Sequence, residues 1–239
     1  MRIISQWTHR LGFLVPSVNA VLERDAVLSL PPAVSAHFAR MPITRDEPEQ
    51  LDALADAAPP AAELLAHPGC AALVFACTTG SLYRGLGFDD EITRRITAAT
   101  GIPASTTSTA VVRALRSLDV TRVLLVSPYE PWLDALVEKF LAAHGITVTA
   151  ARGPALPDPR DCDAVPPAEI AAATGDPGDA EAVLVSCTAF RGLEAAGLLR
   201  DRLDVPVVSS NEATFWAALR LAGRGPGVFP PGGYLDLRR

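Results

Sequence analysis

The chain has 239 residues, of which 49% are hydrophobic and 20% are charged, and its formal net charge is −6. This composition is typical of a folded globular protein and excludes a largely disordered chain. The negative charge and the lack of a basic cluster in the sequence argue against a nucleic-acid partner. No apolar run in the sequence has the length needed to cross a membrane, so we expect a soluble protein without a membrane partner.

The cysteines bear on both compartment and chemistry. Their spacing does not form a disulfide framework, and the sequence carries no recognisable signal peptide, which favours reduced thiols in the cytoplasm. No two of them form a CxxC pair and the four histidines are scattered, so we expect no metal site. The cysteines are Cys70, Cys77, Cys162 and Cys187.

The first half of the chain predicts strands that alternate with helices. Strands are expected at 11–15, 34–40, 71–76 and 102–105, and helices at 20–28, 48–65, 89–100 and 107–118. Ser17 is expected to cap the first helix, with Asn19 in its first turn. Pro59 and Pro60 are expected to interrupt or re-start the second helix, and Gly101 is expected to end the third.

The second half repeats this alternation. Strands are expected at 122–126, 146–151, 182–185 and 205–208, and helices at 132–144, 168–174, 193–202 and 211–221. The proline-rich segment 153–167 is expected to be a surface loop or a lid. Residues 1–10 are expected to form a short leader, and residues 223–239 a surface tail.

Strands that alternate with helices predict an α/β protein built from parallel βαβ units with right-handed crossovers. Because a strand that ends in a cysteine occurs once in each half, we expect two similar lobes around one cleft. The first lobe is expected to contain residues 1–105 and 210–239, with Cys77. The second is expected to contain residues 106–209, with Cys187.

The two cysteines follow apolar strands and precede small polar residues. Ligands of parallel sheets bind outside the carboxyl ends of the strands, and a helix that begins there favours a thiolate and a substrate carboxylate. A thiolate can add to an electron-poor alkene, or it can remove a proton next to a carboxylate. Two thiols on opposite faces suit isomerisation or inversion, so Cys77 and Cys187 are the predicted catalytic pair. Cys70 and Cys162 are expected to be packing residues.

Six short motifs occur in the order found in maleate cis–trans isomerases. This family is related to arylmalonate decarboxylase and belongs to the aspartate/glutamate racemase superfamily. The motifs are Pro16-Ser17-Val18-Asn19, Ala76-Cys77-Thr78-Thr79-Gly80-Ser81, Thr106-Thr107-Ser108-Thr109-Ala110, Ser127-Pro128-Tyr129, Ser186-Cys187-Thr188 and Ser209-Ser210-Asn211-Glu212-Ala213-Thr214-Phe215-Trp216.

The resemblance covers residues 11 to 223. It implies two pseudo-symmetric flavodoxin-like lobes with parallel sheets and an interlobe cleft, no metal or organic cofactor, and a homo-oligomer of two or more chains. It also implies that Cys77 adds to maleate as a thiolate, that the succinyl-cysteine adduct rotates about its new single bond, and that elimination releases fumarate. Cys187 would manage the proton on the opposite face. The positions that match carboxylate-binding residues of the family are Asn19, Thr78, Thr79, Tyr129 and Thr188.

Two departures from the family pattern keep other reactions open. Ala189 and Phe190 stand where the isomerases often have Asn and Leu, which predicts a larger apolar wall and room for a larger substrate. Arylmalonate decarboxylases carry a glycine where Cys77 stands, so Cys77 argues against plain decarboxylation. The alternatives are a racemase of 2-substituted acids that uses both cysteines, a decarboxylase in which Cys187 protonates an enediolate, and a non-catalytic carboxylate-binding protein.

Overall fold

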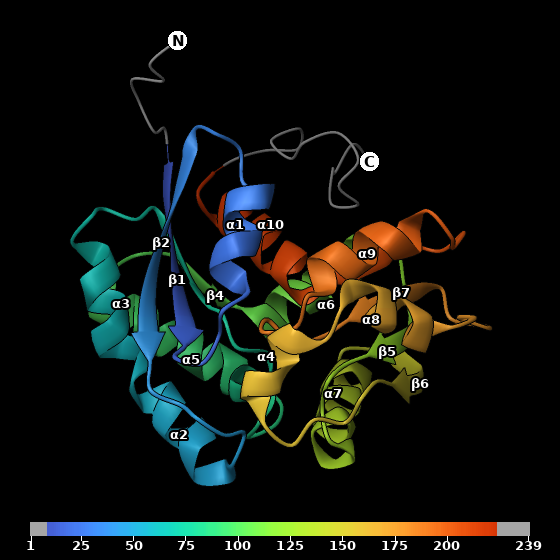
Figure 1. Ribbon diagram of the computed structural model, residues 1–239. Helices are drawn as coiled ribbons and strands as arrows, with labels where there is room; N and C mark the ends of the chain where they lie inside the picture. The colour runs from blue at the N-terminus through green and yellow to red at the C-terminus, as the bar shows by residue number, and fades with distance from the viewer. Residues whose placement is uncertain (1–8, 224–239) are drawn as a thin grey trace.

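The computed structural model describes residues 9–223 and contains two four-stranded parallel sheets (Figure 1). The strands of the first are β1 (His9–Pro16), β2 (Val34–Met41), β3 (Ala72–Phe75) and β4 (Ala104–Thr106), and those of the second are β5 (Arg122–Val126), β6 (Thr147–Arg152), β7 (Ala182–Val185) and β8 (Val207–Ser209). The orders β2-β1-β3-β4 and β6-β5-β7-β8 are equivalent, and they match the start of the flavodoxin-like order. The predicted α/β fold with two similar parallel sheets is confirmed.

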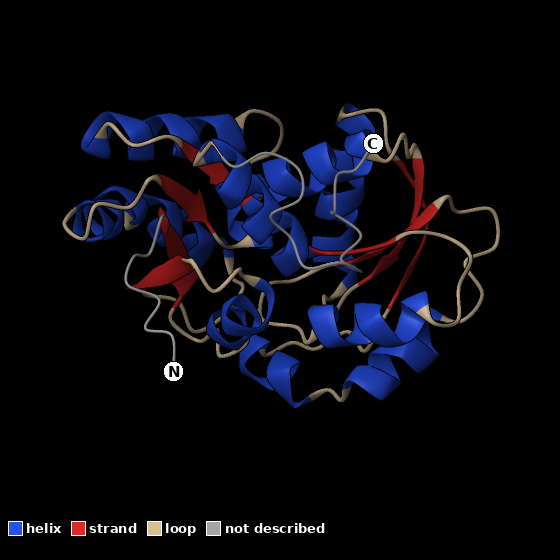
Figure 2. Cartoon of the chain, turned by 90° about the horizontal axis from the view of Figure 1, so that it is seen from above, coloured by secondary structure: helices blue, strands red, loops and turns tan. Residues whose placement is uncertain are grey.

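Helices surround and separate the sheets, which lie on opposite sides of the molecule (Figure 2). They are α1 (Leu22–Ser29), α2 (Pro48–Asp56), α3 (Ala58–Ala66), α4 (Thr78–Leu82), α5 (Phe88–Thr100), α6 (Thr107–Ser117), α7 (Pro131–Ala143), α8 (Pro167–Thr174), α9 (Gly192–Arg200) and α10 (Ser210–Leu221), together with the 3-10 helix η1 (Pro159–Ala164).

Two expectations about helix starts have opposite outcomes. The break expected near Pro59 and Pro60 is confirmed, because the segment 48–65 forms two helices that meet at Ala57 and both prolines lie in the first turn of α3, where the missing N–H groups cost little. Ser17 does not cap α1, because its hydroxyl donates to the carbonyl of Ile43 (2.8 Å) instead. The helix after β8 is capped by Ser209, which accepts a hydrogen bond from the N–H of Glu212.

Helix α10 links the two halves of the molecule. Phe215 and Leu219 of this helix pack against Leu11 and Phe13 of β1 in the core of the first sheet. Trp216, on another side of α10, belongs to the core that α6 and α7 form on the second sheet. The chain therefore returns to the first sheet after β8. The lobe boundaries expected at 105/106 and 209/210 stay a prediction.

Some expectations fall beyond the residues that the structure describes. The leader (1–10) and the tail (223–239) lie almost entirely outside residues 9–223, and β1 already begins at His9. Within 9–223, none of the helices combines the length and the apolar character that a membrane span requires. The same part of the chain contains no group of three or more His, Cys, Asp or Glu side chains arranged to hold a metal ion.

Candidate active site

The carboxyl ends of strands from both sheets converge on one small cavity of about 30 Å³. Both predicted catalytic cysteines line it, one from the end of β3 and one from the end of β7. The lining residues are Pro16, Val18, Ile43, Asp46, Cys77, Thr78, Thr79, Tyr129, Pro159, Cys187, Thr188 and Ala189.

Cys77 lies in extended backbone (φ −140°) and forms the N-cap of the short helix α4. Its Sγ accepts a hydrogen bond from the N–H of Gly80 (3.3 Å) and lies 3.6 Å from Oγ1 of Thr79. A Cβ at position 80 would lie 2.9 Å from Cδ2 of Leu54 and 3.1 Å from the sulfur. Glycine therefore permits the close approach between the helix start and the thiol.

Cys187 has a different backbone. Its φ is +96°, a region that residues other than glycine adopt rarely and at a cost of about 1–3 kcal/mol. Helix α9 begins at Gly192, next to the start predicted at residue 193, so Cys187 is followed by a turn and does not itself stand at a helix start. The N–H of Cys187 instead donates to Oγ of Ser210 (3.3 Å) at the start of α10.

Burial and neighbouring side chains, not a helix start, determine the pKa values of the two thiols. Burial, followed by the charge of Asp46, raises the pKa of Cys77 to about 12, against the lowering effect of the Gly80 N–H. A hydrogen bond with the Cys162 thiol, followed by burial, raises the pKa of Cys187 well above its usual value. The expectation that helix starts would favour thiolates is therefore wrong for the unliganded protein, and a base is needed to form one.

Four of the five predicted binding residues line the cavity, namely Thr78, Thr79, Tyr129 and Thr188. The fifth, Asn19, lies outside the lining and serves the protein itself. Its Oδ1 accepts hydrogen bonds from the N–H groups of Val21 (2.9 Å) and Leu22 (3.0 Å) at the start of α1. Its Nδ2 donates to Oγ1 of Thr188 (3.1 Å). Asn19 therefore fixes the position of a lining residue.

The hydroxyl groups of the lining are tied into the fold. Oγ1 of Thr188 donates to the carbonyl of Ala76 (3.1 Å), which connects the ends of β7 and β3. Oγ1 of Thr78 donates to Oγ of Ser210 (3.5 Å). Burial, followed by the neighbouring Cys187, raises the pKa of Tyr129 well above its usual value. Tyr129 is thus a neutral hydrogen-bonding group near neutral pH.

Sequence reasoning missed two lining or neighbouring groups. Asp46, in the loop between β2 and α2, lines the cavity and accepts a hydrogen bond from Thr79 Oγ1 (3.5 Å). Burial raises its pKa from 3.8 to about 6. Cys162, expected to be a packing residue, is a free, buried cysteine of η1 whose thiol interacts with that of Cys187 by a hydrogen bond. The one signal for Asp46 in the sequence was its position after a predicted strand. The charged residues beside it are typical of a solvated loop and pointed away from a site.

The segment 153–167 reaches the cavity through one residue. It contains η1, the yellow segment beside α4 in Figure 1, and supplies Pro159 to the cavity wall. Phe190, by contrast, does not form the larger apolar wall that was expected. It is fully buried in the core beneath β7 with Val185 and Ala195, and only its neighbour Ala189 reaches the cavity.

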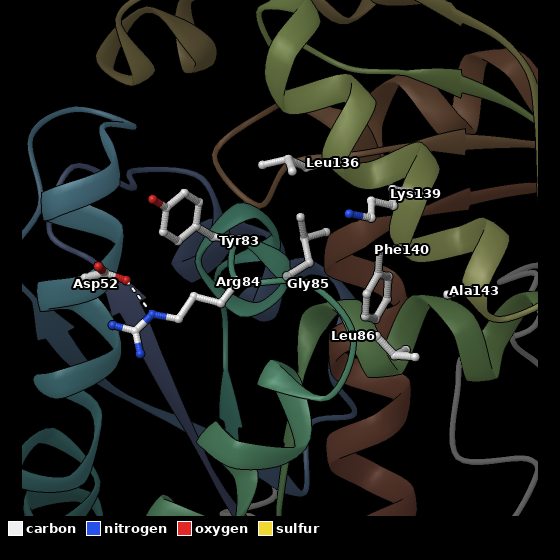
Figure 3. Close-up of a pocket in the computed structure, with 10 residues that line it drawn as sticks. Asp52, Tyr83, Arg84, Gly85, Leu86, Leu136, Lys139, Phe140 and Ala143 are labelled. Atoms are coloured by element: carbon white, nitrogen blue, oxygen red, sulfur yellow. Dashed lines mark hydrogen bonds and ion pairs between the residues drawn. The ribbon is translucent and has the colours of Figure 1, made fainter.

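A larger hollow of about 400 Å³ lies elsewhere, between the turn after α4 and helix α7 (Figure 3). Neither cysteine of the predicted pair is among its lining residues. Arg84, at its edge, is paired with Asp52 (2.7 Å). The chemistry of the cysteines therefore belongs to the small cavity.

Comparisons with known proteins agree with this geometry. The family model for arylmalonate decarboxylase matches residues 11–232. Arylmalonate decarboxylase from Bordetella bronchiseptica is 32% identical over 95% of this chain and 96% of its own length.

Two solved structures are also similar. One is a liganded variant of arylmalonate decarboxylase with a glycine changed to cysteine and a cysteine changed to serine (TM-score 0.86, 31% identity, 95% of this chain and 97% of that one). The other is a cysteine-to-serine variant of Nocardia farcinica maleate cis–trans isomerase with a covalently bound succinylcysteine intermediate (TM-score 0.89, 26% identity, 97% and 99%). The relatives are decarboxylase and isomerase enzymes, and this chain is an enzyme that belongs to the arylmalonate decarboxylase family.

Proposed function

We propose that the enzyme isomerises a small cis-dicarboxylate, maleate or a substituted analogue, to its trans isomer without a cofactor. The observation that supports this most strongly is the pair of cysteines from equivalent strand ends on one cavity. A nucleophile on one side and a proton donor on the other are the two groups that addition to an alkene and its reversal require.

In the proposed reaction, the sulfur of Cys77 adds to one alkene carbon, and Cys187 gives a proton to the other. Rotation about the new single bond brings the carboxylates to opposite sides. Removal of the proton by Cys187 and departure of the Cys77 sulfur then restore the double bond. Hydroxyl groups of Thr78, Thr79, Tyr129 and Thr188 would bind the carboxylates and the charge that develops on them. A succinylcysteine in the Nocardia farcinica isomerase supports an adduct of this kind.

Decarboxylation is the second candidate, because the chain is 32% identical to the Bordetella bronchiseptica arylmalonate decarboxylase. In that reaction Cys187 alone would protonate an enediolate after loss of carbon dioxide, and Cys77 would have no covalent role. The presence of both thiols on the cavity favours isomerisation over this alternative.

Proton NMR of maleate in D₂O tests the proposal. The wild-type protein is expected to form fumarate that retains its vinyl protons, whereas Cys77→Ala forms none. Cys70→Ala is the matched control, because Cys70 is a buried cysteine outside the cavity lining. A folded wild-type protein that forms no fumarate would exclude maleate as a substrate. Deuterium at the α-carbon of a product from an arylmalonate would then support the second candidate.

A further inference from the structure

We propose that Asp46 is the base that receives the proton of Cys77, through the hydroxyl group of Thr79, when the sulfur attacks the substrate. This inference rests on the proposed role of Cys77 as the nucleophile. It gives a function to a carboxyl group that the family resemblance does not account for.

The three side chains form a continuous path. Sγ of Cys77 lies 3.6 Å from Oγ1 of Thr79, and Oγ1 of Thr79 donates to Oδ1 of Asp46 at 3.5 Å. With the hydroxyl proton directed at the carboxylate, the hydroxyl oxygen is free to accept the thiol proton. Both contacts are long, and hydrogen bonds of this kind often shorten when substrate binds.

The site needs such a base because both thiols hold their protons. The pKa of Cys77 is about 12, so a thiolate is scarce near neutral pH. Among the residues that line the cavity, Asp46 is the one carboxyl group, and neither His nor Lys is present among them. Because burial raises its pKa to about 6, Asp46 is mostly ionised at pH 7 and is still basic enough to share a proton.

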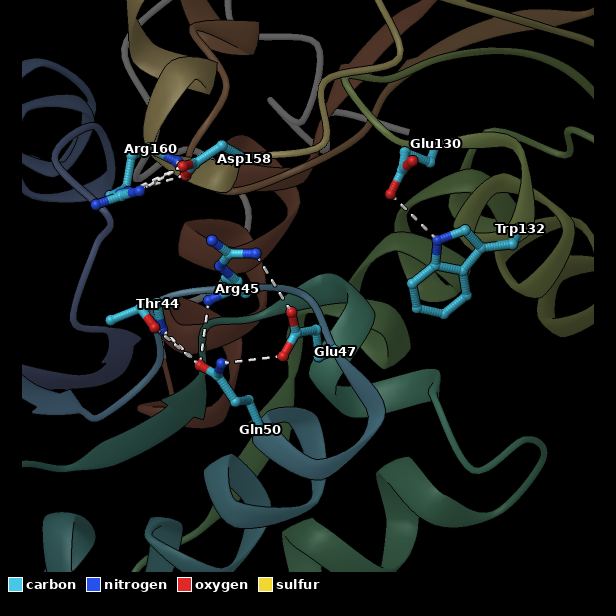
Figure 4. Close-up of polar contacts among 8 residues, drawn as sticks. All are labelled: Thr44, Arg45, Glu47, Gln50, Glu130, Trp132, Asp158 and Arg160. Atoms are coloured by element: carbon cyan, nitrogen blue, oxygen red, sulfur yellow. Dashed lines mark hydrogen bonds and ion pairs between the residues drawn. The ribbon is translucent and has the colours of Figure 1, made fainter.

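The loop that carries Asp46 is fixed on both sides. Oε1 of Gln50, in the first turn of α2, accepts hydrogen bonds from the N–H groups of Thr44 (2.8 Å) and Arg45 (3.1 Å), as Figure 4 shows. The N–H of Ile43 donates to Oγ of Ser17 (3.1 Å), which lies at the end of β1. The sequence around position 46 therefore holds the carboxyl group at the cavity without help from a ligand.

The charged groups around Asp46 pair with one another. Arg45 and Glu47 on its own loop lie 3.6 Å apart, and Arg160 on η1 bonds Asp158 (2.9 Å), as Figure 4 shows. The titratable groups that face Asp46 from the other strand ends are Cys77, Cys187 and Tyr129. Burial thus sets the pKa of Asp46, and the Thr79 hydroxyl moderates it.

The proton transfer leaves the charge of the site unchanged. As the sulfur electron pair forms the bond to carbon, the S–H proton passes to Oγ1 of Thr79 and the Thr79 hydroxyl proton passes to Asp46. The alkene electron pair moves to the neighbouring carbon, which takes a proton from Cys187. In the elimination the same protons return, so Asp46 is a carboxylate again at the end.

The test is the pH dependence of the addition of acrylamide, a small electron-poor alkene, to Cys77, measured by peptide mass spectrometry. In the wild type the rate is expected to rise with pH and to level off above about 6, the pKa of Asp46. In Asp46→Asn it is expected to rise about tenfold per pH unit without levelling, because only free thiolate reacts. Glu49→Gln, which removes an exposed acid of α2, is expected to match the wild type.

Turnover separates this inference from the proposed function. Asp46→Asn is expected to lower kcat/KM for maleate by about 10²-fold, and Asp46→Glu to restore part of it. Thr79→Val, compared with Thr79→Ser, interrupts the same path if Asp46→Asn fails to fold. An acrylamide profile that levels off near pH 6 in Asp46→Asn as in the wild type would overturn the role of Asp46, even where fumarate forms. A wild-type acrylamide profile with the expected shape, together with no fumarate, would instead support Asp46 as the base and exclude maleate as the substrate.

Discussion

The two cysteine-bearing strand ends occupy equivalent places in two equivalent sheets, but their surroundings differ. Cys77 lies in extended backbone, caps α4, and has a carboxylate two contacts away. Cys187 has a positive φ, is followed by a turn instead of a helix, and shares a hydrogen bond with a third thiol, that of Cys162.

The difference shows how one repeated motif supports two roles. The end of β3 is organised by its own helix, whereas the end of β7 is held by side chains from the first half and from α10. Asn19 bonds the hydroxyl of Thr188, and Nδ2 of Asn211 donates to the Thr188 carbonyl (3.1 Å) and to Asp25 (2.7 Å). This asymmetry fits a nucleophile with a nearby base at Cys77 and a rigidly placed proton donor at Cys187.

The largest expected effect separates the two cysteines. Cys77→Ala is expected to lower the rate of fumarate formation at least about 10⁴-fold, because the nucleophile is lost. Cys187→Ala is expected to cost about 10²–10⁴-fold, the range for a group that transfers a proton. Initial rates by NMR measure both. A larger loss in Cys187→Ala than in Cys77→Ala would reverse the assigned roles.

Asp25 provides the next effect, on stability. It is 1% exposed, and burial raises its pKa from 3.8 to about 6. As the pH rises, Asp25 therefore loses its proton at a lower pH in the unfolded chain than in the folded protein. The contribution of Asp25 to the unfolding free energy falls as the pH rises from about 4 to about 6. Asp25→Asn keeps an oxygen for Asn211 and removes that loss. The measured quantity is the unfolding free energy at pH 7 minus that at pH 4. This difference is expected to be more positive in Asp25→Asn than in the wild type by up to about 3 kcal/mol.

Urea unfolding at the two pH values measures this difference. Glu63→Gln is the control, since Glu63 is an exposed acid on α3. If the unfolding free energy of Asp25→Asn has the same pH dependence as that of the wild type, ionisation of Asp25 does not lower the stability of the folded protein.

The smallest expected effect concerns Asn19. Asn19→Ala removes the acceptor for two N–H groups at the start of α1 and is expected to lower the unfolding free energy by about 1–2 kcal/mol. Asn19→Asp retains that acceptor but loses the donor to Thr188, so it is expected to be more stable than Asn19→Ala and still less active than the wild type. Equal stability of Asn19→Ala and the wild type in urea would contradict the capping role.

The sequence predicted most of the elements and the convergence of the cysteines because both follow from local patterns. Apolar runs mark the strands, and the carboxyl ends of parallel strands meet at one edge. Asn19 was predicted as a binding residue because its neighbours fit a motif. Its amide instead hydrogen-bonds the N–H groups of Val21 and Leu22 and the hydroxyl of Thr188. The direction of that side chain depends on packing between the two halves of the chain.

Asp46 and Cys162 escaped prediction for a related reason. Both lie in connecting segments, where residue type alone does not reveal which side faces the protein. The high pKa values of the thiols were also beyond the sequence, since they depend on burial that arises only when both sheets and η1 come together. A helix start after each cysteine was a reasonable expectation, but it held only for Cys77.

The most direct test of the central claim is mass spectrometry of Cys187→Ser after incubation with maleate. Serine is a weaker base than cysteine in the elimination, so the addition product is expected to accumulate, and the peptide that contains Cys77 should gain the mass of one succinyl group. Fragmentation of that peptide should place the added mass on Cys77 and leave Cys70 unmodified. If Cys77 carries no adduct in this variant while the wild type converts maleate to fumarate, isomerisation does not proceed through a Cys77 adduct and the account of the two strand ends is wrong.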